Sequence, residues 1–379
     1  MNVPFDPNKV PSPCFVISAE RLRDNGRILR DVAERSGAKI LLAQKAFAMP
    51  SAYPILRPYL DGTTASSVSE ALLGALHMDK EVHAYSVAYS QQDMERICTF
   101  CSHVIFNSVT QWKRFTPLAQ HYPEVEFGIR INPNYSEVEV EIYNPCQPHS
   151  RFGMTKENLQ GVDLEGIRGF HVHTLCEQGF GPLERMVEVL EKDFADHLHR
   201  LSWLNLGGGH FITKPDYDRT SLIHLIRRLR QTYDLDIILE PGEAVVQETG
   251  WLVADVLDVF CSQGVHHAIC NVSATAHMPD VLEMPYHPEL VGAGSPGERA
   301  VDVMVGGNTC LSGDRIGMYS FDTLPDVGDR FVFTDMAMYT MVKSSHFNGV
   351  PHPSIGIWDH GTFTLHKSFS YQDVRNRLG

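Results

Sequence analysis

A regular alternation of apolar, strand-like runs with helical stretches is the feature that most constrains how this chain can fold. Eight such runs follow one another near 38–42, 62–65, 82–85, 103–107, 126–131, 167–172, 202–206 and 236–239. Strands that alternate with helices form a parallel sheet, which either closes into a (β/α)8 barrel or stays open as a doubly wound sheet. Eight units favour the barrel, so we predict an α/β fold of the TIM type.

Local signals support individual helices and the first strand. Residues 14–17 predict a strand that precedes the alternation, and the next helix is predicted over 19–36 with Gly37 as its stop. Ser67 and Glu70 have the spacing of a helix capping box. A further helix is predicted from about 182 to 199.

The pattern changes after Glu243. Glycine and proline then punctuate strand-like runs at 252–257, 301–305 and 330–333, and long helical patterns are few. We therefore predict two domains: a barrel over 22–243, and a mostly β domain, a sandwich or barrel-like fold, built from 1–21 plus 244–379.

Composition narrows the class of protein. The chain has 379 residues, 43% of them hydrophobic and 21% charged, which is ordinary for a globular protein. A formal net charge of −14 disfavours a nucleic-acid partner. We see no signal peptide and no apolar run of membrane-spanning length. The eight cysteines are dispersed, and we expect reduced thiols in a cytoplasmic protein.

Gly207-Gly208-Gly209 follows the seventh predicted barrel strand, and Gly242 follows the eighth. Glycines let backbone N–H groups approach an anion, and barrels often bind phosphate after strands seven and eight. The run matches neither a P-loop nor a dinucleotide fingerprint. By itself it fits a tight turn as well as a phosphate site.

Three other strand ends carry reactive side chains. Lys45 follows the first barrel strand, His171 and His173 end the sixth, and Glu240 follows the eighth. Each also has a simpler interpretation: Lys45 as a solvated surface charge, the histidines as structural residues, and Glu240 as an exposed acidic residue of a turn. His-x-His on a strand also fits a zinc site, although further ligands are not obvious.

In combination these groups match the needs of pyridoxal phosphate. A lysine traps the aldehyde, an imidazole stacks on the ring, a carboxylate keeps the pyridine nitrogen protonated, and glycines hold the phosphate. We therefore predict a pyridoxal-phosphate enzyme with no metal.

Six motifs in combination resemble the fold-type III pyridoxal-phosphate decarboxylases, which act on ornithine, arginine or diaminopimelate. They lie at 42–46, 169–174, 206–210, 240–243, 306–310 and 335–339. The likeness covers nearly the whole chain and is strongest to the branch that decarboxylates carboxynorspermidine and carboxyspermidine in polyamine biosynthesis.

The resemblance implies a role for each matching residue. Lys45 matches the lysine that binds the cofactor, His173 the stacking imidazole, and Glu240 the carboxylate at the pyridine nitrogen. The phosphate contacts match Gly207, Gly208, Gly209, Gly242 and Tyr339. Cys310 matches the proton donor to the substrate carbon, and Asp314 an acid at the distal end of the substrate. Both reach the site from the other subunit of a homodimer. Arg130 and Arg151 match basic positions whose roles are less defined.

The chain departs from the family at several positions. Glu243 stands where relatives commonly have arginine, Leu175-Cys176 replaces a Gly-Ser pair, and Thr63-Thr64 replaces an aspartate of ornithine decarboxylases. Leu311 stands in place of a glutamate of diaminopimelate decarboxylases, which argues against that substrate.

The segment 274–286 resembles the carboxypolyamine branch. It contains His277, Asp280 and Glu283, and with Glu243 these are the predicted contacts of a cationic substrate. A solvated acidic loop is the alternative for Asp280 and Glu283.

Three alternative functions stay open. They are a related decarboxylase of diaminopimelate, ornithine or arginine, a metal-dependent barrel hydrolase, and a non-catalytic protein that binds pyridoxal phosphate.

Overall fold

The computed structural model describes residues 3–284 and 286–379. Pro285, which belongs to the predicted substrate segment, and the first two residues of the predicted β domain lie outside this range. The chain divides into two compact units. One unit runs from Arg23 to Val245, and the other combines the N-terminal residues up to Leu22 with Val246–Gly379.

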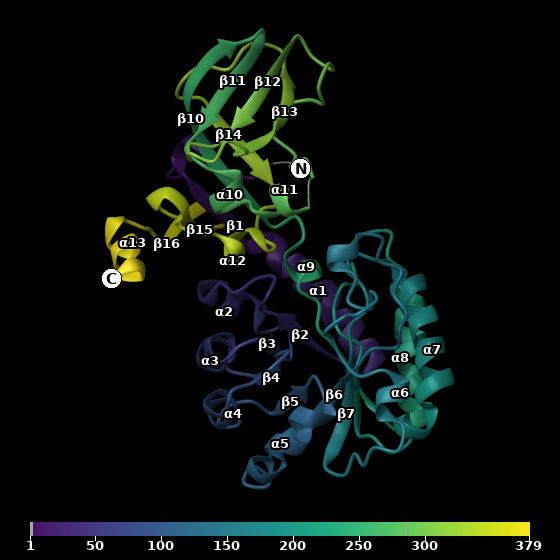
Figure 1. Cartoon of the computed structure of the whole chain (residues 1–379). Coiled ribbons are helices and arrows are strands. Elements are labelled where there is room, and N and C mark those ends of the chain that lie inside the picture. Colours follow the sequence, from purple (N-terminus) through teal and green to yellow (C-terminus); the bar gives the residue numbers. More distant parts are fainter. Residues whose placement is uncertain (1–2, 285) are drawn as a thin grey trace. The chain divides into compact units, whose positions relative to one another are not determined.

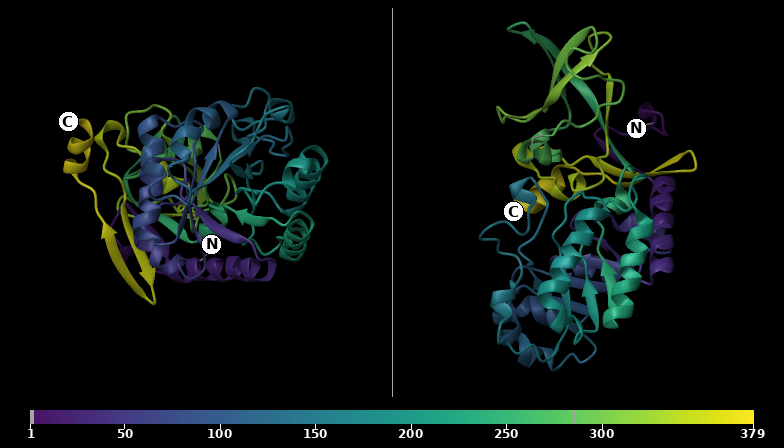
Figure 2. Two further views of the ribbon diagram at one scale, coloured as in Figure 1. Left: turned by 90° about the horizontal axis from the view of Figure 1, so that it is seen from below. Right: turned by 90° about the vertical axis from the view of Figure 1, so that its right-hand side faces the viewer.

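The first unit is built on a closed barrel of eight parallel strands in sequence order (Figures 1 and 2). The strands are β2 (Lys39–Ala43), β3 (Gly62–Ala65), β4 (Glu81–Tyr85), β5 (His103–Phe106), β6 (Glu126–Ile131), β7 (Ile167–Val172), β8 (Trp203–Asn205) and β9 (Asp236–Leu239). Pairing of β2 with β9 closes the ring. The predicted barrel is therefore confirmed, and the open doubly wound sheet is excluded.

Helices cover the outside of this ring (Figure 1). They are α1 (Ala19–Ser36), α2 (Tyr53–Leu56), α3 (Val68–His77), α4 (Gln91–Ile97), α5 (Val109–Ala119), α6 (Lys156–Leu159), α7 (Phe180–Leu198) and α8 (Arg219–Tyr233). The short α9 (Glu243–Val246) follows β9. The predicted stop at Gly37 is confirmed by its φ of 78°. The Ser67 hydroxyl accepts from the Glu70 N–H, but Glu70 bonds the N–H of Ser66, so only half of the predicted capping box forms.

Two glycines make room for an indole inside the barrel. Trp203 packs with Leu41, Ile105 and Ile238 in a buried cluster. A Cβ on Gly128 or Gly169 would lie 2.2 or 1.9 Å from the Trp203 ring. The barrel interior is thus filled by side chains, as expected of a strand ring covered by helices on its outside.

The second unit is built around one large sheet in the order β13-β12-β11-β10-β1-β15-β16, with β14 paired to β10. Its strands are β1 (Cys14–Ser18), β10 (Gly250–Ser262), β11 (Val265–Cys270), β12 (Val301–Gly306), β13 (Arg315–Phe321), β14 (Arg330–Thr334), β15 (Ser354–Asp359) and β16 (Thr362–Lys367). The prediction that the first strand joins the β domain is confirmed, because β1 pairs with β10 and β15.

Short helices complete this unit. They are α10 (Ala274–His277), α11 (Asp280–Glu283), α12 (Thr340–Lys343) and α13 (Tyr371–Leu378). The described residues also form four 3-10 turns: η1 (Pro7–Lys9), η2 (Pro50–Ala52), η3 (Glu141–Tyr143) and η4 (Phe347–Gly349). Among the described residues, no helix has the length and apolar character needed to span a bilayer.

Cys98 and Cys101 have C-x-x-C spacing, an exception to the dispersed pattern of the other cysteines. Both are buried free thiols. Burial raises the pKa of Cys98 to about 11 and that of Cys101 to about 12. Since the thiolate is the reactive form, the raised pKa values favour the protonated, less reactive thiol at both positions.

Candidate active site

A cavity of about 660 Å³ opens at the carboxyl ends of the barrel strands. Its lining includes residues that lie at or just past the ends of five strands: Lys45 (β2), Arg130 (β6), His171 and His173 (β7), Gly208 (β8) and Glu240 (β9). The volume is within the range of ordinary small-molecule sites. The structure therefore gathers into one cavity the four kinds of group that were identified from the sequence.

Lys45 lies two residues beyond β2, and its side chain is accessible from the cavity. The pKa of this lysine is lowered from its usual value, first by desolvation and then by the Arg130 guanidinium. Glu243, Cys176 and Glu240 oppose the shift. A lowered pKa increases the fraction of neutral amine, which is the nucleophilic form.

Glu240 is buried, which excludes the alternative of an exposed turn residue. The side chain of Asn205 donates to its Oε1 at 2.7 Å, and the His171 imidazole donates to its Oε2 at 3.1 Å. Burial alone would raise the pKa of this carboxyl. The favourable interactions with His171, His83 and Asn205 outweigh burial and hold the pKa at about 2, so Glu240 is ionised near neutral pH.

The two histidines of the His-x-His pair have different partners. The backbone N–H of Gly208 donates to Nδ1 of His173 at 3.0 Å, and His171 Nε2 bonds Glu240. Burial, Lys45 and Arg130 hold the pKa of His173 well below its usual value. His173 is thus a neutral ring that lines the cavity, and each imidazole already uses one nitrogen within the protein.

The glycine run turns tightly against two neighbouring strand ends. A Cβ on Gly208 would lie 2.3 Å from the Glu240 carbonyl oxygen, and one on Gly209 would lie 2.1 Å from that of Leu175. Gly207 and Gly209 also have φ values of 68° and 84°. The amide of Gly207 bonds Asn205 and that of Gly208 bonds His173. The run is therefore a tight turn at the cavity wall, and two of its amides are used internally.

Gly242 does not contribute to the described lining of the cavity. A Cβ there would meet the Ala46 Cβ at 2.6 Å, so the glycine lets the turn after β9 pack against the segment that carries Lys45. Glu243 follows it and is buried. Because Glu243 raises the pKa of both Lys45 and Cys176, its charge acts on this end of the barrel.

Arg130 is a buried cation in the cavity wall. It donates to the His173 carbonyl oxygen at 3.2 Å. Its guanidinium lies over the rings of Tyr85 and Phe152, at 4.7 and 4.4 Å from their centroids. Arg151 also lines the cavity and lies over Phe152. Both arginines suit an anionic ligand.

The remaining predicted residues belong to the second unit. Cys310 is exposed on the segment between β12 and β13, and its N–H bonds Asn348 Oδ1 at 2.7 Å. Tyr339 is half-buried before α12. Asp314 is buried and accepts from the backbone of Ala274 at 2.7 Å and from Thr309 at 3.2 Å. Asp314 thus fixes the Cys310 segment, and a direct substrate contact for it stays a prediction.

Asp280 and Glu283 lie on helix α11 and not in a loop, and both bind the Lys343 ammonium at 2.5 Å, although the Glu283 side chain stays half exposed. His277 is fully buried, and its Nδ1 accepts from the Ser273 N–H at 3.1 Å. Burial and His352 lower the pKa of His277 to about 4. These contacts assign structural roles to the three residues, and their substrate roles stay predictions.

The structure adds residues at or beside the cavity that the sequence motifs had not identified. Asn205 holds Glu240, and Tyr85 stacks on His171. A loop that includes Tyr143 and Asn144 also lines the cavity. Asn205 and Tyr85 each end a barrel strand, and that position is the signal that could have revealed them.

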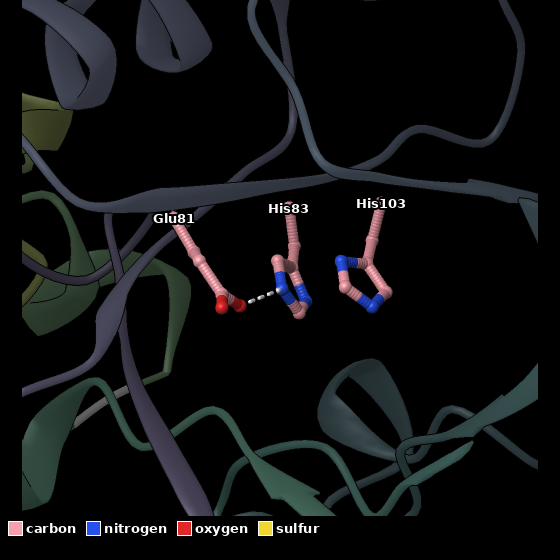
Figure 3. A group of neighbouring side chains, drawn as sticks. All are labelled: Glu81, His83 and His103. Carbon is pink, nitrogen blue, oxygen red and sulfur yellow. Dashed lines mark hydrogen bonds and ion pairs between the residues drawn. The ribbon is translucent and has the colours of Figure 1, made fainter. Parts of the chain in front are cut away.

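Glu81, His83 and His103 form a cluster at the opposite, amino-terminal end of the barrel (Figure 3). Their potential ligand atoms lie within 4.8 Å of one another. However, the two imidazoles stack with centroids 3.9 Å apart and 23° between planes. Ring lone pairs lie in the ring plane, so stacked rings direct them along nearly parallel lines and not at one ion. Glu81 also binds the Lys39 ammonium at 2.7 Å, so we interpret the cluster as structural.

Buried neutral imidazoles should make the barrel sensitive to acid. Burial, followed by the charge of His83, lowers the pKa of His103 to about 3, and burial lowers that of His210 to about 4. Unfolded, each titrates near about 6.5. Below that pH the unfolded chain binds protons that the folded barrel excludes, so stability falls. We expect His103 and His210 each to contribute a loss of about 1.4 kcal/mol per pH unit between pH ~6 and ~4, and the buried His171 and His173, whose pKa values are also lowered, to add to it.

Urea unfolding at several pH values across this range measures the slope. His103→Gln removes one of these groups and should lower the slope by about 1.4 kcal/mol per pH unit. Equal free energies of unfolding near pH 7 and pH 5 would contradict the assignment of both histidines as neutral.

Comparisons with known proteins agree on one family. A model described as "Pyridoxal-dependent decarboxylase, C-terminal sheet domain" matches residues 14–337. A carboxyaminopropylagmatine decarboxylase of Synechocystis sp. is 43% identical, over 98% of this chain and 96% of that protein. A carboxynorspermidine/carboxyspermidine decarboxylase of Campylobacter jejuni is 38% identical, over 97% of this chain and 99% of its own length.

A solved structure of a decarboxylase of this kind also matches the chain. The crystal structure of carboxynorspermidine decarboxylase complexed with norspermidine, from Campylobacter jejuni, matches with a TM-score of 0.90 and 36% identity. The match covers 97% of this chain and 100% of that one. The likeness therefore extends over both units.

Proposed function

This chain belongs to the pyridoxal-dependent decarboxylase family, and on that basis we propose that it removes the α-carboxylate of a carboxylated polyamine. The observation that carries the proposal is the cavity at the barrel mouth. It combines a lysine of lowered pKa, a neutral imidazole and an ionised, buried glutamate. We propose carboxynorspermidine and carboxyspermidine as substrates, which yield norspermidine and spermidine with CO2.

The cavity residues suit pyridoxal phosphate. When bound, the cofactor supplies an electron-accepting ring that takes up the electrons of a broken bond to the substrate carbon. Lys45 would hold its aldehyde carbon, Glu240 its pyridine nitrogen and His173 one face of its ring. Gly208 lines the cavity, which supports a phosphate contact at this turn. Since the amides of Gly207 and Gly208 already have acceptors, we assign the contact to the Gly209 amide, with Gly242 and Tyr339 as further predicted partners.

The chain's own groups then have defined tasks. Lys45 would hold the cofactor until the substrate α-amino group takes its place, and desolvation favours the neutral form of the lysine amine. The anionic Glu240 keeps a proton at the pyridine nitrogen. His173 is neutral and presents a flat ring without adding positive charge to the site. Cys310 of a second subunit donates the proton that replaces the lost carboxylate.

One observation favours a second candidate substrate. The relative at 43% identity is named for carboxyaminopropylagmatine, and the relative at 38% identity for carboxynorspermidine and carboxyspermidine. These substrates share a carboxylated aminopropyl arm and differ at the distal end, which is a guanidinium in one and an ammonium in the others. Both ends are cations, which suits acidic contacts such as Glu243, Asp280 and Glu283.

Competition among substrates tests the proposal. The holoenzyme is mixed with equal amounts of carboxynorspermidine, carboxyspermidine, carboxyaminopropylagmatine, meso-diaminopimelate, ornithine and arginine, and products are identified by mass spectrometry. We expect only decarboxylated polyamines. One methylene separates carboxynorspermidine from carboxyspermidine, which corresponds to a preference of about 10- to 200-fold at most. Lysine, putrescine or agmatine as the main product would refute the carboxypolyamine assignment.

We propose a homodimer with shared active sites, as the family resemblance implies for Cys310, which is an exposed free thiol. Lys45→Ala and Cys310→Ala should each be inactive as homodimers. After the two are mixed and re-equilibrated, random exchange should restore about one-quarter of wild-type activity, since half of the dimers carry one intact site of two. Mixtures that stay inactive after verified subunit exchange would refute the shared site.

The eight cysteines are free thiols in the structure. Reduced thiols are typical of a cytoplasmic enzyme, and we propose that location.

A further inference from the structure

We propose that His171 is a positioning residue that orients the Glu240 carboxylate toward the pyridine nitrogen of the cofactor. This inference deepens the proposed function and depends on it. His171 acts through Glu240, and we assign it no direct contact with the substrate.

The barrel register aligns the donors beside Glu240. His171 on β7 pairs in register with Asn205 on β8, and Arg130 on β6 pairs with His171. Glu240 directly follows β9, the next strand. This register places the His171 and Asn205 side chains beside the Glu240 carboxylate, and each donates to a different oxygen. Two donors on separate oxygens fix both the position and the rotation of the carboxylate plane.

Both donors leave acceptor capacity on the carboxylate. An ionised carboxylate has about four lone-pair sites, and His171 and Asn205 occupy one on each oxygen. A protonated pyridine nitrogen can therefore still donate to Glu240. Without the two donors, a carboxylate that is only 7% exposed would lose much of the stabilisation of its charge.

The charge state of His171 matters as much as its position. The ring is only 3% exposed, and burial lowers its pKa despite the neighbouring Glu240. Arg130 and Lys45, which face it from other strands, lower the pKa further. A neutral imidazole donates a hydrogen bond without cancelling the charge of Glu240. The negative charge thus remains available to a protonated pyridine nitrogen, whereas an imidazolium would compete with it.

Packing holds the imidazole in this orientation. The ring of Tyr85 stacks on His171 with centroids 5.2 Å apart and 20° between planes. The Tyr85 hydroxyl donates to Asn107 Oδ1 at 2.7 Å, and Arg130 covers the Tyr85 ring. Nδ1 of His171 has no hydrogen-bond partner among the described residues, so Nε2 makes the one polar contact that orients the ring. This packing and the single polar contact suit a role for His171 in which it directs one hydrogen bond, from Nε2 to Glu240.

The test compares His171→Phe, which removes the donor, with His171→Gln, whose side-chain amide nitrogen can take the place of Nε2. Both proteins are loaded with pyridoxal phosphate carrying 15N at the ring nitrogen. The chemical shift of that nitrogen distinguishes its protonated from its neutral form and does not depend on turnover. If His171→Phe does not fold, His171→Asn replaces it, since its amide is too short to reach Glu240.

We expect the 15N signal of the donor-free variant to move toward the neutral form, and that of His171→Gln to stay near wild type. The kcat of the donor-free variant should fall about 10- to 100-fold, as expected for loss of a hydrogen bond to a buried charge, while KM changes little. His171→Gln should recover most of this loss.

Two results would overturn the inference: an unchanged 15N signal in the donor-free variant, or equal losses in the Phe and Gln variants. Either result would be obtained with an active wild-type enzyme. Failure of the proposed function is a different outcome, because the wild-type protein itself would then release no polyamine.

Discussion

Lys45→Ala should abolish turnover and remove the visible absorbance of the lysine-bound cofactor. The amine is the group in the cavity that can attach the cofactor covalently, and its lowered pKa supplies the reactive form. We expect kcat to fall by at least about 10⁴-fold, because both proton transfer and orientation of the reacting groups are lost. Absorbance spectra and single-turnover assays of purified protein provide the measurement.

Lys39→Ala is the matched control, since Lys39 begins the same strand at the opposite end of the barrel. Its ammonium binds Glu81, so its loss should lower stability and leave the cofactor absorbance in place. If the Lys45→Ala protein keeps the absorbance of a lysine-bound cofactor, another lysine attaches the cofactor.

Glu240→Gln should lower kcat far more than it weakens cofactor binding. Glutamine keeps the size of the side chain but carries no charge to hold a proton at the pyridine nitrogen. By analogy with the loss of one preorganised electrostatic contact, we expect about a 10²- to 10³-fold decrease in kcat. Steady-state kinetics at saturating cofactor, with cofactor affinity measured separately, distinguish the two effects.

Glu81→Gln serves as its control. The interaction with His83 and with Lys39 lowers the pKa of Glu81 to about 2, although burial opposes the shift, but the residue lies at the amino-terminal end of the barrel. Its replacement should reduce stability without a comparable effect on kcat. If the Glu240→Gln enzyme has the wild-type kcat, Glu240 has no role in catalysis.

The sequence predicted the barrel well because its signals are local. Each barrel strand is a short apolar run, and β3, β6, β7 and β9 begin and end at the residues predicted for them. Residues just beyond such runs must lie at one end of a closed parallel barrel. That rule is enough to bring Lys45, His173 and Glu240 into one cavity.

The polar contacts within the site were less predictable, because they join residues far apart in the chain. Nothing near Glu240 in the sequence indicates that Asn205 and His171 donate to it. Likewise, Lys343 reaches Asp280 and Glu283 from a different helix, so two acids that looked solvated have a cation as partner. Which side chains become hydrogen-bond or ion-pair partners depends on strand register and packing, and local sequence patterns do not determine these.

Loss of one carboxylate carbon as CO2 is the central claim, and a labelled substrate tests it most directly. The holoenzyme would be given carboxynorspermidine with 13C in the α-carboxylate, and labelled CO2 and polyamine would be quantified together. We predict equal amounts of 13CO2 and norspermidine, both dependent on pyridoxal phosphate. A substrate that is consumed without release of 13CO2, or that stays intact with the cofactor bound, would contradict the account.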